Sequence, residues 1–248
     1  MKYLLAAGCS HTAGSEIDGT EDSEHNRQHS FAGVLAEKLD RKLINIASHG
    51  SSNPTIARSV IEWFDENYKP EMDVFTLVGW AESSRMEIPT PHTNTYGFES
   101  RHWRSNTEKH FLRINQGWAG GTDWERDIMP DYHRFIVNNL EYLEIISANL
   151  VLQLQYFFKS KNLDYVMCNT QHMFGNSRHL NFYLSQIDNS KYMNMLDTDK
   201  DFYWYYRNRG YENPKAKYWH HDDLPHMLDR KSTRLNSSHG YISYAVFC

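Results

Sequence analysis

The feature that most constrains the fold is the alternation of short apolar runs with segments of helical periodicity. Lys2–Ala7 and Asp73–Trp80 are short apolar runs, and their length and composition predict buried strands. Phe31–Asp40 and Asp131–Lys161 instead carry apolar residues at the spacings of an amphipathic helix. Strands that alternate with helices pair in parallel through crossover connections. The sequence therefore predicts a three-layer α/β/α sandwich with a parallel sheet of the flavodoxin-like type.

Two further strands and one further helix complete the predicted layers. Leu43–Ala47 and Leu163–Cys168 are predicted strands, and Pro54–Asn67 is a predicted helix with Asn53 as its N-cap. Residues 83–130 lose this periodicity and are rich in Trp, His, Arg and Gly, which predicts an insertion or lid near a site. Ligands of such sheets bind outside the carboxyl ends of the strands.

The last residues of the chain, 229–248, do not continue the preceding pattern. Asp229–His239 matches, codon for codon, a translation of a common short-read sequencing adapter, and Ile242–Cys248 matches the next stretch of that adapter. Two matches in the right order indicate a foreign tail, which is excluded from functional reasoning. We therefore expect residues 1–228 to form the natural domain and the protein's own C-terminus to be missing.

Composition narrows the functional class. With 26 Lys plus Arg against 31 Asp plus Glu, the formal net charge is −5, so we expect no nucleic-acid partner. The apolar runs are shorter than the roughly 20 residues of a membrane-spanning helix, and no export signal is visible. Cys9, Cys168 and Cys248 cannot form a disulfide framework, which favours a reducing compartment. We therefore expect a cytoplasmic protein without a membrane partner.

A serine follows the first predicted strand. The segment Gly8–Thr12 reads GCSHT, and Ser10 lies in the turn that ends the strand, where backbone N–H groups can face an oxyanion. The pattern is not the G-x-S-x-G elbow of α/β-hydrolases, because Thr12 stands at the last position. Two interpretations of Ser10 follow: it is a nucleophile, or it is a turn or cap residue.

Three segments resemble the sequence blocks of the SGNH (GDSL) hydrolase superfamily. LLAAGCSHTAGSE is similar to the first block, which assigns the nucleophile to Ser10, with Cys9 in place of the usual aspartate. INIASHGSSNPTIAR is similar to the second block, whose glycine N–H binds the oxyanion, which assigns Gly50. LVGWAESSR occupies the place of the third block, but no asparagine follows Gly79. This form resembles a subgroup common among phage and metagenomic sequences. Asn53 is a candidate replacement for the missing amide donor.

The last block of the family, Asp-x-x-His, is matched by Asp223 and His226. The resemblance implies that His226 takes the proton from Ser10 and that Asp223 orients the imidazole. An alternative alignment makes His220 or His221 the base, although no aspartate lies three residues before either of them.

The segment His220–His226 also admits two other interpretations. Imidazole and carboxylate groups are ligands of zinc or iron, which would indicate a metal-dependent hydrolase. The histidines could instead be surface residues of an acidic loop. His133, His172 and His179 are scattered and add no paired ligand spacing, so we expect no metal and no cofactor.

The resemblance implies a serine esterase or acyl hydrolase whose substrate is a small-molecule or glycan ester, for example an O-acetyl group on a glycan. Substrate choice would then lie in residues 83–130. The altered third block leaves an alternative open, a catalytically silent protein of the SGNH fold that binds a glycan or serves as a phage accessory factor. The sequence contains no indication of the oligomeric state.

Overall fold

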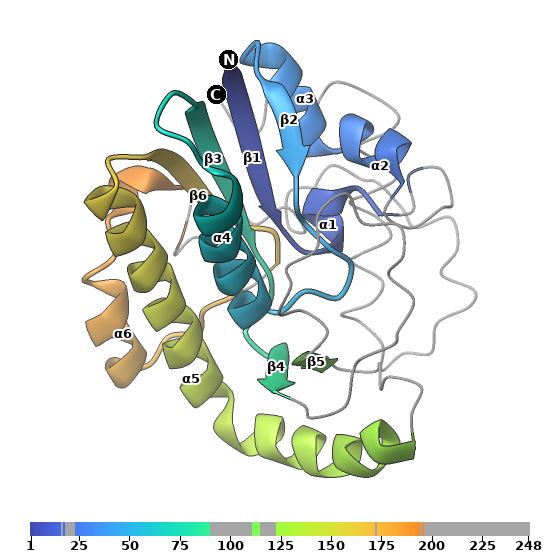
Figure 1. Ribbon diagram of the computed structural model, residues 1–248. Helices are drawn as coiled ribbons and strands as arrows, with labels where there is room; N and C mark the ends of the chain where they lie inside the picture. The colour runs from blue at the N-terminus through green and yellow to red at the C-terminus, as the bar shows by residue number, and fades with distance from the viewer. Residues whose placement is uncertain are drawn as a thin grey trace, which may run out of the picture.

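A parallel sheet forms the centre of the molecule. The computed structural model describes residues 1–15, 17, 23–89, 111–114, 123–171, 173–193 and 195. Within these residues the central sheet has the strand order β2-β1-β3-β6-β7, and all neighbours are parallel (Figure 1). The strands are β1 (Lys2–Gly8), β2 (Lys42–Asn45), β3 (Asp73–Trp80), β6 (Asp164–Asn169) and β7 (Tyr192–Met193). This is the flavodoxin-like order of a doubly wound sheet. The predicted α/β sandwich is therefore confirmed.

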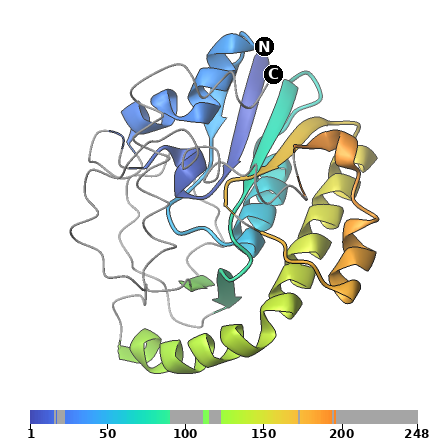
Figure 2. The ribbon, with the colours of Figure 1, turned by 180° about the vertical axis from the view of Figure 1, so that it is seen from behind.

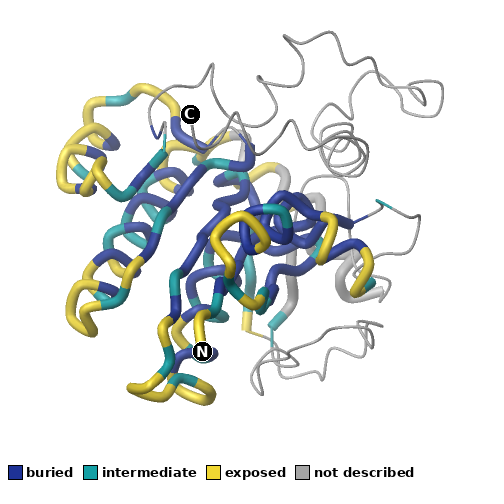
Figure 3. Tube along the Cα trace, turned by 90° about the horizontal axis from the view of Figure 1, so that it is seen from above, coloured by how far each residue is buried: buried dark blue, intermediate teal, exposed yellow. Residues whose placement is uncertain are grey.

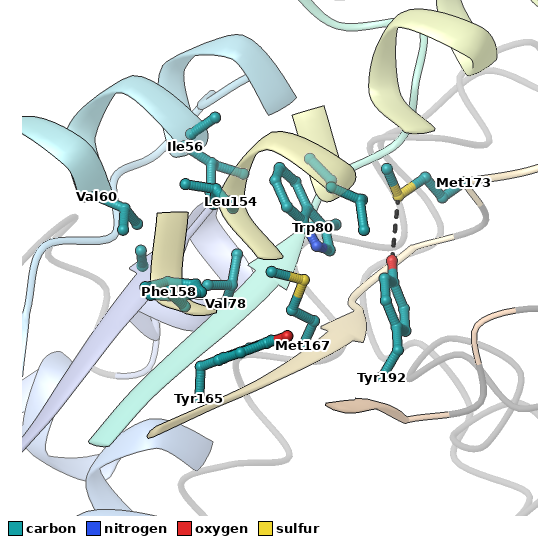
Figure 4. Close-up of a cluster of buried hydrophobic side chains, with 14 of the residues drawn as sticks. Ile56, Val60, Val78, Trp80, Leu154, Phe158, Tyr165, Met167, Met173 and Tyr192 are labelled. Carbon is teal, nitrogen blue, oxygen red and sulfur yellow. Dashed lines mark hydrogen bonds between the residues drawn. The ribbon is translucent and has the colours of Figure 1, made fainter. Parts of the chain in front are cut away.

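One face of the sheet is covered by three helices, α4 (Asn53–Asn67), α5 (Asp123–Ser160) and α6 (Arg178–Leu184). Val60, Leu154 and Phe158 from α4 and α5 pack on Val78 and Met167 of the strands, and all five are fully buried (Figure 4). The apolar positions of these helices lie three or four residues apart, so they gather on one side. Their burial explains why the strands and helices could be located from periodicity.

The opposite face carries α3 (Phe31–Lys38), which is reached from β1 through two short helices, α1 (Ser10–Ala13) and α2 (Glu24–His29) (Figure 2). Phe31 and Leu35 of α3 pack against Leu4 and Ala6 of β1. Ser30 caps α3, since its hydroxyl accepts a hydrogen bond from the backbone of Gly33. The central strands are therefore apolar on both faces, as parallel strands between two helical layers must be.

Burial follows these layers. The strands are largely buried, whereas exposed residues lie on the outer sides of the helices and in the turns at the sheet's amino end (Figure 3). Large exposed apolar side chains do occur on the outer helices, among them Tyr156 and Phe182. Such single residues are normal on protein surfaces.

The segment 83–130, predicted as an insertion or lid, contains regular structure. β4 (Met86–Pro89) and β5 (Phe111–Ile114) form a separate antiparallel pair. Helix α5 begins at Asp123, earlier than the predicted start at Asp131, and continues through Pro130. The helix departs from helical geometry at Asn139, whose φ is −137° and ψ is 27°.

Candidate functional site

Ser10 lies where β1 ends, at the carboxyl edge of the sheet. It begins the short helix α1, and the backbone N–H of Ser15 donates to its carbonyl oxygen at 3.0 Å. The helix ends at Gly14, whose φ of 74° is in the left-handed region that favours glycine. A Cβ at this position would also lie 2.4 Å from the carbonyl oxygen of Asn26. Ser10 itself is only 1% exposed. The chain therefore holds this serine in a tight, buried turn.

Two glycines let the Ser10 turn pack closely on the sheet. Gly8 of β1 and Gly79 of β3 are opposite each other in register, and the side chain of Thr12 lies over both. A Cβ would lie 2.1 Å from Thr12 Oγ1 at Gly8 and 2.4 Å from the same atom at Gly79. Side chains at these positions would therefore push the Ser10 turn away from the ends of β1 and β3.

The loop after β2 is joined directly to the Ser10 turn. The Asn45 side chain donates to the carbonyl oxygen of Thr12 at 2.9 Å, and the backbone N–H of Ser48 donates to the carbonyl oxygen of Gly8 at 3.1 Å. Gly50, farther along this loop, has a φ of 68°. The structure thus brings the loops of Ser10 and Gly50 together at one edge, which is what their positions after neighbouring parallel strands predict.

Asn53 is not the N-cap of α4, and this part of the sequence prediction was wrong. The cap is Ser52, whose hydroxyl accepts a hydrogen bond from the backbone of Thr55. The Asn53 amide nitrogen donates to the carbonyl oxygen of Ala81 at 3.1 Å and to Ser147 Oγ at 3.0 Å, and its oxygen accepts from the Ala81 N–H at 2.9 Å. Both amide hydrogens are therefore engaged in joining α4 to α5 and to the loop after β3.

The loops after β3 and β6 are joined to each other beside the Ser10 turn. The Thr170 hydroxyl donates to the carbonyl oxygen of Trp80 at 2.7 Å. The same hydroxyl lies 3.4 Å from the Cys9 thiol, next to Ser10. The N–H of Glu82 donates to Oε1 of Gln171 at 3.4 Å. Four strand ends thus contribute buried polar groups to one region.

A buried arginine anchors the loop that carries Gly50. Arg27 of α2 is 2% exposed, and its Nη1 donates to the carbonyl oxygens of Asn45 at 2.7 Å and of Ala47 at 2.9 Å. Sequence reasoning missed Arg27, because it lies in a polar stretch without apolar periodicity. It missed Thr170 and Gln171 as well. Their only sequence signal is their position directly after a predicted strand.

The Cys168 thiol of this region is not activated. Cys168 of β6 is buried, and burial raises its pKa to about 12, with a smaller contribution from Cys9 nearby. Burial likewise raises the pKa of Tyr192 well above its usual value. A thiol with so high a pKa is protonated at neutral pH and is a poor nucleophile. Among the described groups near this edge, Ser10 is therefore a better candidate nucleophile than Cys168.

The β4–β5 pair is attached to the amino end of α4. Glu87 of β4 accepts hydrogen bonds from Arg58 Nη2 at 2.8 Å and from the Thr55 hydroxyl at 2.8 Å. The Arg58 guanidinium also lies over the ring of Phe111 of β5, 4.4 Å from its centroid. The Glu87 side chain is 5% exposed, so the ion pair is well shielded from water. This pair of strands is thus held at the amino end of α4, the helix that begins at Asn53 after the Gly50 loop.

The predicted proton-transfer residues lie outside the described residues. Asp223 and His226, the alternative bases His220 and His221, the histidine-cluster metal site and the adapter-like tail all fall there. Within the described residues, no three His, Cys, Asp or Glu side chains come together in a way that could hold a metal ion. Among the same residues, no helix has both the length and the apolar character needed to cross a membrane.

Comparison with known proteins does not assign the chain to a family. No protein-family model matches the chain, and a search of curated proteins returns no significant match.

Proposed function

We propose that the protein is a serine ester hydrolase of the SGNH type, with Ser10 as the nucleophile. The observation that carries the proposal is the position of Ser10. It is the second residue after β1, at the carboxyl edge of the sheet, and its turn is hydrogen-bonded to the end of β2 and to the loop that leads to Gly50. Doubly wound sheets of this strand order bind ligands at this edge, between β1 and β3, where the strand order reverses.

In the proposed reaction, Ser10 Oγ attacks the carbonyl carbon of an ester while a histidine removes its proton. His226, oriented by Asp223, is the proposed base, with His220 or His221 as the alternative. The same imidazole then protonates the departing alcohol, and a water molecule hydrolyses the acyl-serine. The backbone N–H groups of Gly50 and Ser10 stabilise the oxyanion. Asn53 is left out of this set because both of its amide hydrogens are already donated.

The proposed substrate is a small-molecule or glycan ester, such as an O-acetylated sugar, and the reaction needs no metal or cofactor. The attachment of β4 and β5 to the amino end of α4, which follows the Gly50 loop, supports a role for residues 83–130 in substrate choice. Cys9 and Cys168 are buried thiols that form no disulfide among the described residues, which supports a cytoplasmic location for the reaction.

A second candidate is a catalytically silent protein of the same fold that binds a glycan or acts as a phage accessory factor. Two observations favour it. Ser10 is 1% exposed, so a substrate reaches it only if neighbouring residues move. No asparagine follows Gly79, and Asn53 has no amide hydrogen left to replace it.

The two candidates are separated by Ser10-dependent chemistry. The test protein carries the gene's own 3′ sequence in place of the codons for residues 229–248, and is assayed with p-nitrophenyl acetate and a fluorophosphonate probe. We expect Ser10→Ala to lower turnover by about ten-thousandfold or more and to abolish labelling. Ser48→Ala, a buried serine of the neighbouring loop, is the matched control and should retain both. If neither turnover nor labelling depends on Ser10, the proposal that this protein is a serine ester hydrolase is wrong.

The base is identified by separate alanine substitutions of His220, His221 and His226. We expect His226→Ala to lower turnover far more than the other two substitutions. If His220→Ala or His221→Ala gives the largest loss of turnover instead, the alternative alignment is correct. Activity that is abolished by a chelator and restored by zinc or iron would favour the metal-dependent hydrolase.

A further inference from the structure

Gln171 is a buried amide whose hydrogen-bonding capacity is only half used. It is the second residue after β6, at the carboxyl edge of the sheet, and is 1% exposed. Its Oε1 accepts from the backbone N–H of Glu82 at 3.4 Å, which identifies the oxygen end of the amide because an N–H needs an acceptor. Its Nε2 has no acceptor within the part of the chain that the structure describes. Buried amide donors are rarely left in this state, and each exception needs a physical explanation, of which a catalytic role is one.

The surroundings of Gln171 connect it to Ser10. The preceding residue, Thr170, lies 3.4 Å from the Cys9 thiol through its hydroxyl, and Cys9 precedes Ser10. Thr170 Cγ2 would lie 2.9 Å from a Cβ at Gly79, on which Thr12 of the Ser10 turn also packs. Glycine at position 79 therefore lets the Ser10 turn and the loop after β6 approach each other across the end of β3.

The loop after β3 contributes no amide of its own to this region. Residues 81–85 read Ala-Glu-Ser-Ser-Arg. The N–H that Gln171 accepts belongs to Glu82 within this loop, so the Gln171 amide is attached to the loop that lacks such a side chain. Asn53 is bonded to Ala81 of the same loop, but with both of its amide hydrogens already donated. Gln171 is thus the side chain at this edge that combines burial with an available amide N–H.

We infer that the Gln171 side-chain amide donates a hydrogen bond to the substrate oxyanion in the Ser10 site. The inference rests on the proposed function, because it requires a tetrahedral intermediate on Ser10. The donor would act together with the backbone N–H groups of Gly50 and Ser10. Because the Glu82 N–H holds Oε1, Nε2 is oriented before the substrate arrives, which is what an effective oxyanion donor requires.

The test compares Gln171→Glu with Gln171→Met in the protein that carries its own 3′ sequence. Gln171→Glu preserves shape and the acceptor for Glu82 but removes the donor, and Gln171→Met removes both groups without adding charge. We expect each to lower kcat for p-nitrophenyl acetate by about 100-fold or more, with a much smaller change in KM. Affinity for methylboronic acid, whose serine adduct is a tetrahedral anion, should fall by a similar factor.

A control separates this role from a structural one. Gln155 of α5 is a buried glutamine whose Oε1 and Nε2 are both bonded to the backbone of Asp188. Gln155→Met should lower thermal stability while leaving kcat per labelled serine and boronate affinity unchanged. If both Gln171 variants keep kcat and boronate affinity within about threefold of wild type, the inference is wrong. If the wild-type protein lacks Ser10-dependent turnover, the proposed function itself fails.

A measurement on the wild-type protein covers the case in which the variants do not fold. The side-chain amide resonances of Gln171, assigned by NMR, should shift downfield and exchange more slowly with water when methylboronic acid binds Ser10. The side-chain resonances of Asn53, whose hydrogens are already donated, should change little. Saturation with boronate that leaves the Gln171 resonances unchanged would overturn the inference.

Discussion

Polar side chains are buried at the carboxyl edge of the sheet, whereas charged side chains reach solvent at its amino edge. At the carboxyl edge, Asn53, Thr170 and Gln171 are all 1% exposed or less, and each bonds to the loop of another strand. At the amino edge, Arg41 and Asp73 form an ion pair at 2.7 Å in which the Asp73 side chain is 52% exposed. Both edges belong to the same strands. The difference in burial therefore comes from the segments that connect strands and helices at each edge.

The amino-edge connections are short turns. Asp40 and Asn162 take positive φ values of 51° and 52° and reverse the chain between a helix and the next strand. Such turns enclose little space and leave their charges hydrated. The loops at the carboxyl edge carry short polar side chains that bond to one another's backbone, away from water. Hydrogen bonds are stronger in that environment, and an unpaired group is costly. Substitutions at the two edges should therefore differ in their effects.

The largest effect on stability is expected for Asn53→Leu at the carboxyl edge. The substitution leaves the N–H and carbonyl of Ala81 and the hydroxyl of Ser147 without their partner, and each buried unpaired group costs roughly 1–3 kcal/mol. We expect the free energy of unfolding, measured by urea denaturation, to fall by about 3 kcal/mol or more. Asn149→Ala, which removes one bond within α5, should cost about 0.5 kcal/mol. If Asn53→Leu and Asn149→Ala lower the free energy of unfolding equally, the buried polar groups at the carboxyl edge have no special importance for stability.

An intermediate effect is expected at alkaline pH. In the folded protein the pKa of Cys168 is raised by burial to about 12 from a reference value of 9.0, and the pKa of Tyr192 is also raised by burial. An unfolded chain loses these protons first, so their contribution is fully present below about pH 9 and is lost as pH rises toward 12. The free energy of unfolding, measured by urea denaturation at each pH, should fall over this range by at most about 1.4 kcal/mol per pH unit for each group. In Cys168→Ala the free energy of unfolding should fall less steeply with pH. An unchanged slope would show that Cys168 does not contribute to the alkaline loss of stability.

The smallest effect is expected for Asp73→Asn at the amino edge. The Arg41 hydrogen bond lowers the pKa of Asp73, so this carboxylate contributes stability above its unfolded pKa and loses it as pH falls. Because the pair is exposed, water and salt screen it. We expect the thermal midpoint of the variant at neutral pH to match that of the wild type, and more closely still in high salt. If Asp73→Asn destabilises the protein as much as Asn53→Leu, polar substitutions at the two edges of the sheet do not differ in their effect on stability.

Much of the fold was predictable because burial periodicity is local. The run Asp73–Trp80 matched β3 residue for residue, and Pro54–Asn67 differed from α4 by one residue at its start. The least accurate region was 83–130, where the β4–β5 pair and the first turns of α5 were missed. Its many polar and aromatic residues follow neither the strand nor the helix period, so pattern alone does not identify its elements.

The site was predictable only in part. That Ser10 and Gly50 lie at one edge follows from their positions after parallel strands, and the structure brings their loops together. The role of Asn53 was misjudged because Ser52 and Asn53 are both good N-caps, and sequence alone does not say which side chain turns back to the helix. Asp223 and His226 stay predictions, since they fall beyond the described residues.

The sequence by itself determined the strands β1, β2, β3 and β6, the helices α3 and α4 and most of α5, and that Ser10 would lie just after β1. The physical reason is that alternating burial, caps and turns act between residues near in the chain. Only the tertiary structure decided the partners of Asn53, Arg27 and Gln171. Asn53 reaches across 28 and 94 positions to Ala81 and Ser147. Such bonds depend on which loops the packed layers bring to the same edge, and no local pattern encodes that.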